Sequence, residues 1–376
     1  MTAAAPRSLA LDALRGGAVA LMILVNNPGS WSHLFSPLDH AQWHGCTPTD
    51  LVFPFFLFAV GASLAYTLPQ RGTGFWPRVA KRAALIFAIG LFLNASPFVR
   101  WSAEGELVMR HWEQLRVMGV LQRIALAYFF AAAIVHLLGA RGALRTAMLL
   151  LLGYWAACVA FGGSDPYSLE GFFGTALDRA LLGPAHLYQG EGVAFDPEGL
   201  TSTVPAVAQV LLGHAAGRLL VRRPPGAALI ARLFTMACLL LALGYAWQLA
   251  MPLNKKLWTS SYVLHTSGLA LAALALLGQW LDSGPRRGAV ATALLAFGRN
   301  ALFVFVLSGL LPRVLALLRW REGTEWISPL PWLYRHVFAA IPGDPRLGSL
   351  AYALAVLAAL VALALWMDRR RLYVRV

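Results

Sequence analysis

Charged residues are scarce in this sequence, and their scarcity decides the class of protein. Of its 376 residues, 13% are Asp, Glu, Lys or Arg, whereas 59% are hydrophobic. A soluble globular domain has about 25% charged and about 45–50% apolar residues. The composition therefore excludes a soluble enzyme and a disordered chain, and it indicates that lipid forms part of the solvent around the protein.

Cysteines and the motifs of soluble enzymes are also few or missing. Cys46, Cys158 and Cys238 form no CxxC pair, so they predict neither a disulfide framework nor a cysteine metal site. His40 and His44 have the spacing of a helical metal pair, but a third ligand and an HExxH glutamate are lacking. We therefore expect no metal site. The sequence also lacks GxGxxG, P-loop and GxSxG motifs.

Long apolar runs, by contrast, are abundant. About 20 mostly apolar residues cross a bilayer core as a helix, and ten segments meet this description. We therefore predict an all-α fold, a polytopic transmembrane helix bundle of about ten spans that forms one domain over residues 1–376. A shorter segment, 328–342, carries Arg335, and we interpret it as re-entrant or interfacial. The predicted spans are 9–27, 51–69, 83–98, 117–138, 146–162, 200–219, 229–250, 258–281, 289–311 and 348–367.

Basic residues are distributed unevenly between the two sides that these spans define. Of 31 Lys and Arg residues, 18 fall on the side of the two termini, together with three acids; the other 13 share their side with 14 acids. Cytosolic loops carry an excess of Lys and Arg, so we predict that both termini are cytosolic. The net charge of +14 is spread over short loops rather than one patch, which favours membrane lipid and not nucleic acid as a partner.

The long, chemically varied loops all fall on the opposite side, at 28–50, 99–116, 163–199 and 312–347. Long ordered loops are often functional. The first of them contains His40 and ends at Asp50, where the second span begins. A neutral imidazole is a suitable proton acceptor near pH 7, so this loop holds the first candidate for catalysis.

Each charged side chain within or beside a span is expected to have a partner or a function, because inserting a charge at a helix centre costs about 2.5–3.5 kcal/mol on insertion scales. Asp12 and Arg15 have the spacing of a local ion pair. Arg123 requires an acid, a carbonyl or a ligand, and we expect Asp50, Asp196 or Glu198 to be available to it. For Arg299 no acid is evident at the same depth. The candidate binding residues are Asp12, Arg15, Asn26, Asp50, Gln122, Arg123, Asp196, Glu198, Lys255, Arg299 and Asn300.

Several of these residues also have a purely structural interpretation. Asn26 stands at a helix end, and Asp50 is placed to cap a helix. Glu198 suits the first turn of the next span, and Lys255 can reach the membrane interface. From the residues alone, a membrane enzyme and a proton-coupled sugar permease both remain open.

Five unusual strings follow one another along the chain. In these strings the sequence resembles the heparan-alpha-glucosaminide N-acetyltransferase family, over roughly residues 7–310. The family's catalytic histidine lies in an H-A-x-W-x-G string, which places it at His40, and Asn26 matches the asparagine after M-I-L-V. The strings are LDALRGGAVALMILVNNPGSW, HAQWHGCTPTDLVFPFFLFAVGASL, RVMGVLQRIALAYF, HLYQGEGVAFDPEGLTSTVPAVAQVLLGHAAGRLL and PLNKKLWTSSYVL.

The resemblance implies an acetyltransferase that takes acetyl-CoA as a co-substrate from the cytosol. The acetyl group passes to the amine of a terminal glucosamine on the far side of the membrane. His40 then acts either as the base that deprotonates the amine or as an acetyl carrier. The expected location is a bacterial inner membrane. An amino-sugar permease stays the alternative, and both the identity of the amino sugar or glycan and a homodimer are left open.

The candidate residues take expected roles under this resemblance. His40 and Asn26 form the catalytic group, with Asn26 and Arg123 orienting the thioester. Acidic side chains suit a cationic acceptor. The substrate-binding group is Asp50, Gln122, Arg123, Asp196, Glu198 and Lys255, and the group that holds CoA is Asp12, Arg15, Arg299 and Asn300.

Overall fold

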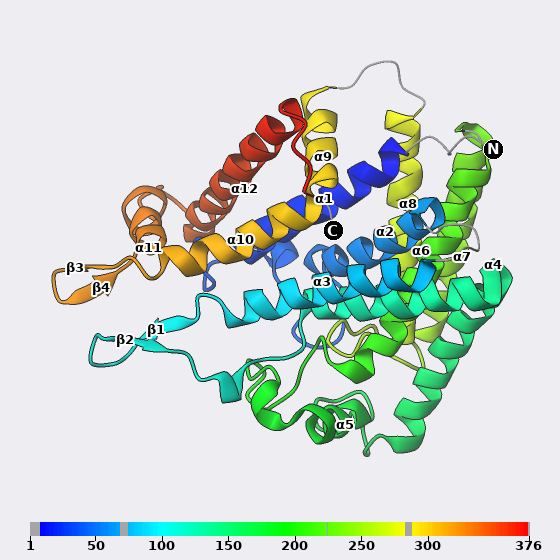
Figure 1. Ribbon diagram of the computed structural model, residues 1–376, viewed down its shortest axis with the longest axis horizontal. Coiled ribbons are helices and arrows are strands. Elements are labelled where there is room, and N and C mark those ends of the chain that lie inside the picture. The colour runs from blue at the N-terminus through cyan, green and yellow to red at the C-terminus, as the bar shows by residue number, and fades with distance from the viewer. Residues whose placement is uncertain (1–7, 68–73, 224, 283–287, 375–376) are drawn as a thin grey trace.

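Helices make up most of the computed structural model, which describes residues 8–67, 74–223, 225–282 and 288–374 (Figure 1). Two short antiparallel hairpins interrupt them, so the fold is mostly helical rather than all-α. The helices are α1 (Leu9–Asn26), α2 (Val52–Thr67), α3 (Phe75–Ala95), α4 (Val120–Phe161), α5 (Phe173–Leu182), α6 (Leu200–Arg222), α7 (Ala227–Trp247), α8 (Ser260–Leu281), α9 (Ala289–Arg299), α10 (Ala301–Leu315), α11 (Pro329–Leu333) and α12 (Pro345–Arg369). The strands are β1 (Val99–Trp101), β2 (Leu107–Met109), β3 (Trp320–Glu322) and β4 (Glu325–Ile327), and single helical turns lie at η1 (Ser36–Leu38), η2 (Pro48–Leu51), η3 (Trp112–Gln114), η4 (Pro184–His186) and η5 (Tyr334–Phe338).

Seven of the described helices are long and apolar enough to cross a membrane: α1, α2 with its preceding turn, α4, α6, α7, α8 and α12. The predicted span 289–311 is in fact the pair α9 and α10, bent by 83°, and the number becomes eight if this pair counts as one span. The predicted spans 117–138 and 146–162 both lie in α4, which is interrupted at Gly139 (φ 64°). Glycine tolerates this left-handed conformation because it has no Cβ.

Small residues bring the central helices into backbone contact. A Cβ at Gly61 of α2 would lie 1.9 Å from the carbonyl oxygen of Val210 of α6, and one at Gly213 would lie 2.1 Å from that of Phe58. The same arrangement joins α1 to α9, where a Cβ at Gly298 would lie 1.9 Å from the carbonyl oxygen of a residue on α1. Small residues permit such close approach between helices in a membrane, so these glycines set the contacts of α2 with α6 and of α1 with α9.

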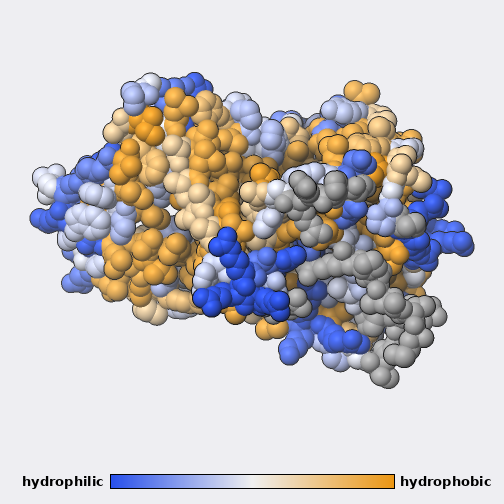
Figure 2. All heavy atoms as spheres, turned by 90° about the horizontal axis from the view of Figure 1, so that it is seen from above, coloured by the Kyte–Doolittle hydropathy of each residue, from blue (hydrophilic) through white to orange (hydrophobic). Residues whose placement is uncertain are grey.

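Outer helices present large apolar side chains to the surroundings. Leu149 of α4, Leu239 of α7 and Trp366 of α12 are each more than half exposed. Figure 2 shows apolar side chains over broad areas of one face of the molecule, with hydrophilic side chains at its left and right edges and in a cluster at its lower centre. Soluble monomers rarely expose apolar areas of this extent. Together with the long apolar helices, this surface makes the chain an integral membrane protein.

The long loops meet at one end of the bundle. The indole of Trp43 donates to the carbonyl of Tyr167 at 2.7 Å, which joins the first long loop to the third. The indole of Trp101 donates to the carbonyl of Leu317 at 3.3 Å, which joins the second to the fourth. Figure 1 shows α5 and both hairpins at the lower and left edges, away from the start of α1 and from α9. We call the end that these four loops form the loop end, and the opposite one the α1/α9 end.

Candidate active site

Asp50 is held in place by the turn that starts the second span. Its carboxylate is 1% exposed, and Oδ2 accepts the backbone N–H of Thr47 at 3.0 Å and that of Ala41 at 3.1 Å. The hydroxyl of Thr47 donates to the same oxygen at 3.1 Å. The predicted capping role of Asp50 is therefore present in η2, as a reciprocal cap with Thr47. Oδ1 of the same carboxylate remains available to other groups.

His40 uses that second oxygen. Its Nδ1 lies 2.7 Å from Oδ1 of Asp50, while the imidazole is 42% exposed. A carboxylate only accepts hydrogen bonds, so in the neutral ring Nδ1 carries the proton and Nε2 keeps the lone pair. The buried Asp50 thus fixes the ring and leaves Nε2 as the basic atom.

Lys255 completes this group from a distant part of the chain. Its Nζ lies 3.0 Å from Nδ1 and 3.2 Å from Nε2 of His40, and 3.5 Å from Oδ1 of Asp50. The side chain comes from the tight turn between α7 and α8, where Asn254 Oδ1 accepts the N–H of Leu257 at 2.9 Å. Burial lowers the pKa of the Lys255 ammonium, although the charges of nearby acids, Asp50 first among them, oppose this. Lys255, which the sequence suggested as a substrate-binding residue, thus contacts His40 directly.

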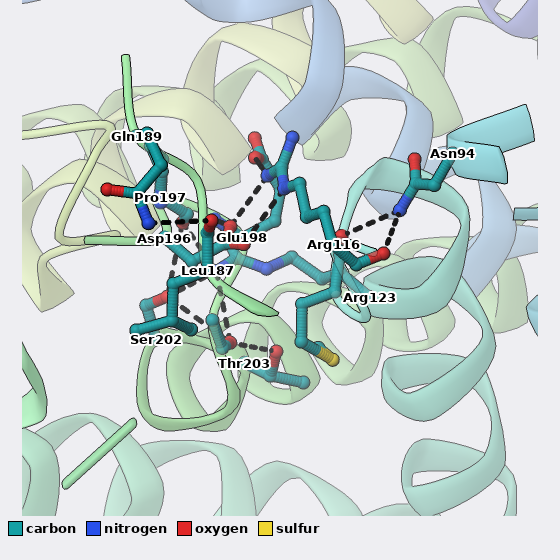
Figure 3. Close-up of polar contacts among 12 residues, drawn as sticks. Asn94, Arg116, Arg123, Leu187, Gln189, Asp196, Pro197, Glu198, Ser202 and Thr203 are labelled. Atoms are coloured by element: carbon teal, nitrogen blue, oxygen red, sulfur yellow. Dashed lines mark hydrogen bonds and ion pairs between the residues drawn. The ribbon is translucent and has the colours of Figure 1, made fainter. Parts of the chain in front are cut away.

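A second polar group lies beside the first and centres on Arg116, which the sequence gave no reason to select. Figure 3 shows its guanidinium facing two carboxylates. It donates to both oxygens of Asp196, at 2.8 and 2.6 Å, and to Glu198 at 2.6 Å. Burial would raise the pKa of Glu198, but the charges of Arg116, Arg123 and Lys255 outweigh it and lower that pKa. Glu198 therefore remains ionised at neutral pH.

Arg123 does not form the ion pair that the sequence suggested. Its side chain is fully buried, and Nη2 donates to the carbonyl of Pro197 at 2.6 Å and to the hydroxyl of Ser202 (Figure 3). The guanidinium lies over the ring of Trp258 at 4.9 Å. Asp196 and Glu198 are engaged instead by Arg116, which lies in the loop before α4. Within the described part of the chain, Nε and Nη1 of Arg123 find no hydrogen-bond partner, so they are available to a ligand.

Two further candidates have different surroundings. Asn26 is exposed at the end of α1, a helix that touches η2, and its amide makes no hydrogen bond to another described residue. Gln122 is buried, and its Oε1 fills the space that a Cβ at Gly90 of α3 would require. Asn26 is therefore free to meet a substrate, whereas Gln122 packs α4 against α3.

The four expected CoA-binding residues come together at the α1/α9 end. Arg15 donates to Asp12 at 3.4 Å, to the carbonyl of Gly298 at 3.1 Å and to the hydroxyl of Ser63 at 2.7 Å. Gly298 immediately precedes Arg299 and Asn300. The clustering follows from the close contact of α1 with α9.

Arg299 has an acidic partner, contrary to the expectation from the sequence. Its Nη1 lies 2.7 Å from Oδ1 of Asp368, in the last turn of α12. The 83° bend places Arg299 at a helix end rather than within a span, and there α12 reaches it. Asn300 donates to the carbonyl of Leu372 at 3.1 Å, so the bend also holds the segment that follows α12.

The polar residues at the loop end and those at the α1/α9 end suit a protein that handles different ligands on two sides. The profile of the family described as heparan-alpha-glucosaminide N-acetyltransferase, catalytic, matches residues 7–245, which is more than half of the chain. The chain belongs to this family. The matched region includes His40, Asp50 and Arg116, together with the acids that Arg116 binds, Asp196 and Glu198. Lys255 and Arg299 lie beyond it.

Individual members of the heparan-alpha-glucosaminide N-acetyltransferase family are similar over most of this chain. The human protein of that name is 28% identical over 371 residues, covering 81% of this chain and 53% of its own length. The mouse protein is 29% identical over 362 residues, covering 80% of this chain and 53% of its own. The chain thus spans about half the length of the curated relatives it matches.

Proposed function

We propose that this protein is a transmembrane N-acetyltransferase. It moves the acetyl group of cytosolic acetyl-CoA to the amine of a glucosamine-type sugar on the periplasmic or lumenal side. Family membership supports the reaction type. The observation that carries the assignment to a site is the pair of His40 and Asp50 at the loop end, with an ammonium group within 3.2 Å of His40 Nε2.

The geometry supports a role for His40 as a general base. Asp50 holds Nδ1, and Nε2 faces the side chain of Lys255. The Lys255 ammonium lies beside both the imidazole and the carboxylate, so the amine acceptor must displace it to reach Nε2. The acceptor, bound there as an ammonium, gives one proton to Nε2, and its neutral nitrogen then attacks the acetyl carbon. As the thioester C–S bond breaks, the nitrogen loses a second proton to the departing CoA thiolate, and His40 releases the first proton to solvent.

An acetyl-histidine intermediate fits the same geometry. In that route Nε2 of His40 attacks the thioester and releases CoA, and the sugar amine takes the acetyl group in a second step. Acid quenching after incubation with radiolabelled acetyl-CoA, without any sugar, separates the two routes. Label that stays with the wild-type protein and is missing from His40→Gln supports the carrier, and no retained label supports direct transfer.

The proposed roles of the remaining residues follow from the end of the bundle at which each lies. Asp196 and Glu198 carry the negative charge that attracts a cationic acceptor, and Asn26 and Arg123 supply donors for the thioester oxygen. At the α1/α9 end, Arg15 and Arg299 supply cations for the phosphates of CoA. We place this end in the cytosol of a bacterial inner membrane, with both termini there. This arrangement crosses the membrane ten times if α4 crosses it twice, α3 once, and the pair of α9 and α10 counts as one crossing.

The test is an acetylation assay with purified protein, acetyl-CoA and glucosamine, read by mass spectrometry. A general base contributes about 10²–10⁴-fold, so His40→Ala should lose at least about a hundredfold in rate while its melting temperature stays unchanged. His33→Ala, in the same loop and outside the proposed site, is the matched control. Retained activity in His40→Ala removes His40 from this role, and uptake of labelled glucosamine into proteoliposomes without acetyl-CoA favours a permease instead.

A further inference from the structure

The ammonium group of Lys255 occupies the position that the proposed mechanism gives to the amine of the acceptor. Its Nζ lies 3.2 Å from Nε2 of His40 and 3.5 Å from Oδ1 of Asp50. Because Asp50 binds the proton on Nδ1 at 2.7 Å, Nε2 is the ring nitrogen that can accept a proton from Lys255. Lysine and glucosamine both carry a primary amine, so the same base meets the same functional group in either case.

The turn between α7 and α8 holds Lys255 in this position. The backbone N–H of Asn254 donates to the hydroxyl of Thr259 at 3.0 Å, and that of Trp258 donates to the carbonyl of Lys255 at 3.1 Å. The backbone on both sides of Lys255 is therefore ordered, and the amine belongs to the same molecule as its base. Well-oriented groups within one molecule reach effective concentrations of about 10⁵–10⁸ M, so a poised lysine competes strongly with a sugar in solution.

The surroundings of Lys255 also favour its reactive form. The nucleophile is the neutral amine, and the ammonium ion does not attack a thioester. Burial lowers the pKa of Lys255, and this makes the loss of its proton to His40 easier. The side chain is nevertheless 20% exposed, so a ligand that enters the site can reach it.

Lys256 provides a comparison within the same turn. Its side chain is 22% exposed, which is close to the value for Lys255. Within the described part of the chain, its Nζ donates to the carboxylate of Glu191 at 2.7 Å and to the carbonyl of Gln42 at 3.1 Å, and not to His40. The two lysines thus have similar access to a reagent in solution, but they differ in contact with the imidazole.

We propose that Lys255 is a self-acetylation site, which takes the acetyl group of acetyl-CoA when no acceptor sugar is bound. The proposal rests on the proposed function, because it uses the same base and the same donor. One proton of the Lys255 ammonium passes to Nε2 of His40, and Nζ forms a bond to the acetyl carbon. The C–S bond of the thioester breaks, the CoA thiolate takes a second proton from Nζ, and His40 returns the first to solvent.

The product of this reaction differs from an acetyl carrier. An N-acetyl-lysine is an amide, so it does not pass its acetyl group to a sugar, and it has lost the positive charge of Lys255. Its acetyl group lies where the amine of the acceptor must enter. Self-acetylation should therefore inactivate the enzyme in acetyl-CoA alone, whereas a bound sugar, which displaces Lys255, should protect it.

Peptide mass spectrometry detects the modification directly. The purified full chain in detergent is incubated with acetyl-CoA and no sugar, digested, and fragmented so that Lys255 and Lys256 are distinguished. A general base contributes about 10²–10⁴-fold, so Lys255 should be acetylated at least about a hundredfold faster than Lys256. In His40→Gln the rate at Lys255 should fall to that of Lys256. Lys256→Arg is the matched control and should keep the wild-type rate at Lys255.

Protection by sugar provides a test that needs no variant. Glucosamine at ten times its dissociation constant should slow acetylation of Lys255 by about tenfold, by mass action. The same concentration of mannitol, which has no amine, should not. Neutral hydroxylamine removes an acetyl group from an imidazole but not from the amine of a lysine, so this treatment separates acetylated Lys255 from an acetyl group on His40.

Each outcome decides the proposal. Acetylation confined to Lys255, dependent on His40 and slowed by glucosamine, supports it. If the same preparation acetylates glucosamine but leaves Lys255 unmodified, the proposal is overturned and the proposed function stands. Equal acetylation of Lys255 and Lys256, or acetylation that persists in folded His40→Gln, also overturns it, because the reaction is then uncatalysed. If Lys255 is acetylated and no sugar is, the self-acetylation stands and the proposed acceptor fails by itself.

Discussion

At the scale of single residues, Asp50 serves two purposes with one carboxylate. One oxygen accepts three donors from the first loop, and the other orients His40. The loop conformation and the proposed catalytic geometry therefore depend on the same buried charge. A further residue in this loop, Cys46, reports on that charge without taking part in the proposed reaction.

The thiol of Cys46 should be unusually unreactive. Burial, with the charge of Asp50, raises its pKa to about 12. A higher thiol pKa means less thiolate, the reactive form, so at pH 8 alkylation by iodoacetamide should be about a thousandfold slower than for a free cysteine. The rate should rise as the pH approaches 12. The measurement uses a Cys158→Ala/Cys238→Ala background, in which Cys46 is the only thiol.

Unfolding provides the control for this prediction. In denaturant the burial is lost, and Cys46 should react at the rate of an ordinary cysteine. Rapid alkylation of the folded protein at pH 8 would contradict the burial that the structure assigns to this loop.

Local sequence information predicts His40 and Asp50 but not Arg116. The first two lie ten residues apart in one loop, and the cap at Asp50 follows from the residue types around it. Arg116 meets Asp196 and Glu198 across about eighty residues of sequence. Hydropathy carries no information about which loops meet, so Arg123 was assigned the acids that Arg116 holds.

At the scale of elements, the contact between α2 and α6 depends on glycine. Gly213→Ala should be destabilising, because its Cβ would lie 2.1 Å from the carbonyl oxygen of Phe58 and would force the helices apart. Overpacking of this kind costs about 1–3 kcal/mol, so the melting temperature in detergent should fall by several degrees. Gly309→Ala in α10 is the control, because nothing lies within 4 Å of its Cβ position. Equal melting temperatures of the two variants would refute the close contact.

The bend between α9 and α10 gives the second prediction at this scale. Arg299 and Asp368 form a partly exposed ion pair, with 27% and 19% of the side chains exposed. Such pairs contribute about 0–1 kcal/mol, so Asp368→Asn should lower the melting temperature only slightly. Arg299→Gln should also raise the KM for acetyl-CoA, with kcat nearly unchanged, if Arg299 reaches the cofactor.

A double-mutant cycle separates the two roles of Arg299. If the residue only anchors α12, Arg299→Gln and Arg299→Gln/Asp368→Asn should have the same KM as the wild type. A raised KM in both arginine variants, but not in Asp368→Asn, supports contact with CoA.

Helical segments were predictable because lipid imposes length and hydrophobicity on them. Each of the ten predicted ranges overlaps a helix, although residues 68–69 of the range 51–69 lie outside the described part of the chain; the hairpins of β1–β2 and β3–β4 were missed. Their strands have three residues each and are largely exposed, so they carry no hydrophobic alternation long enough to detect. The bend before Asn300 was missed because the two helices together are long and apolar enough for one span, despite Arg299 and Asn300 between them.

At the scale of the whole molecule, the distribution of charge predicts two different sides. Eighteen basic residues and three acids belong to the predicted cytosolic side, and the four long loops meet at the opposite end of the bundle. An excess of Lys and Arg is retained in the cytosol during insertion, so the sidedness of the proposed reaction follows from the same asymmetry that orients the chain.

This orientation predicts the behaviour of reporter fusions in a bacterial host. Green fluorescent protein fused after Val376 should fluoresce and alkaline phosphatase at the same point should be inactive, because the first folds in the cytosol and the second requires the periplasm. An epitope inserted at Gly192 should be accessible to antibody in spheroplasts without permeabilisation, since nothing lies within 4 Å of its Cβ position. The opposite pattern at both points would show that the protein has the reverse orientation in the membrane. His40 would then share a compartment with acetyl-CoA, and no transfer of the acetyl group across the membrane would be needed.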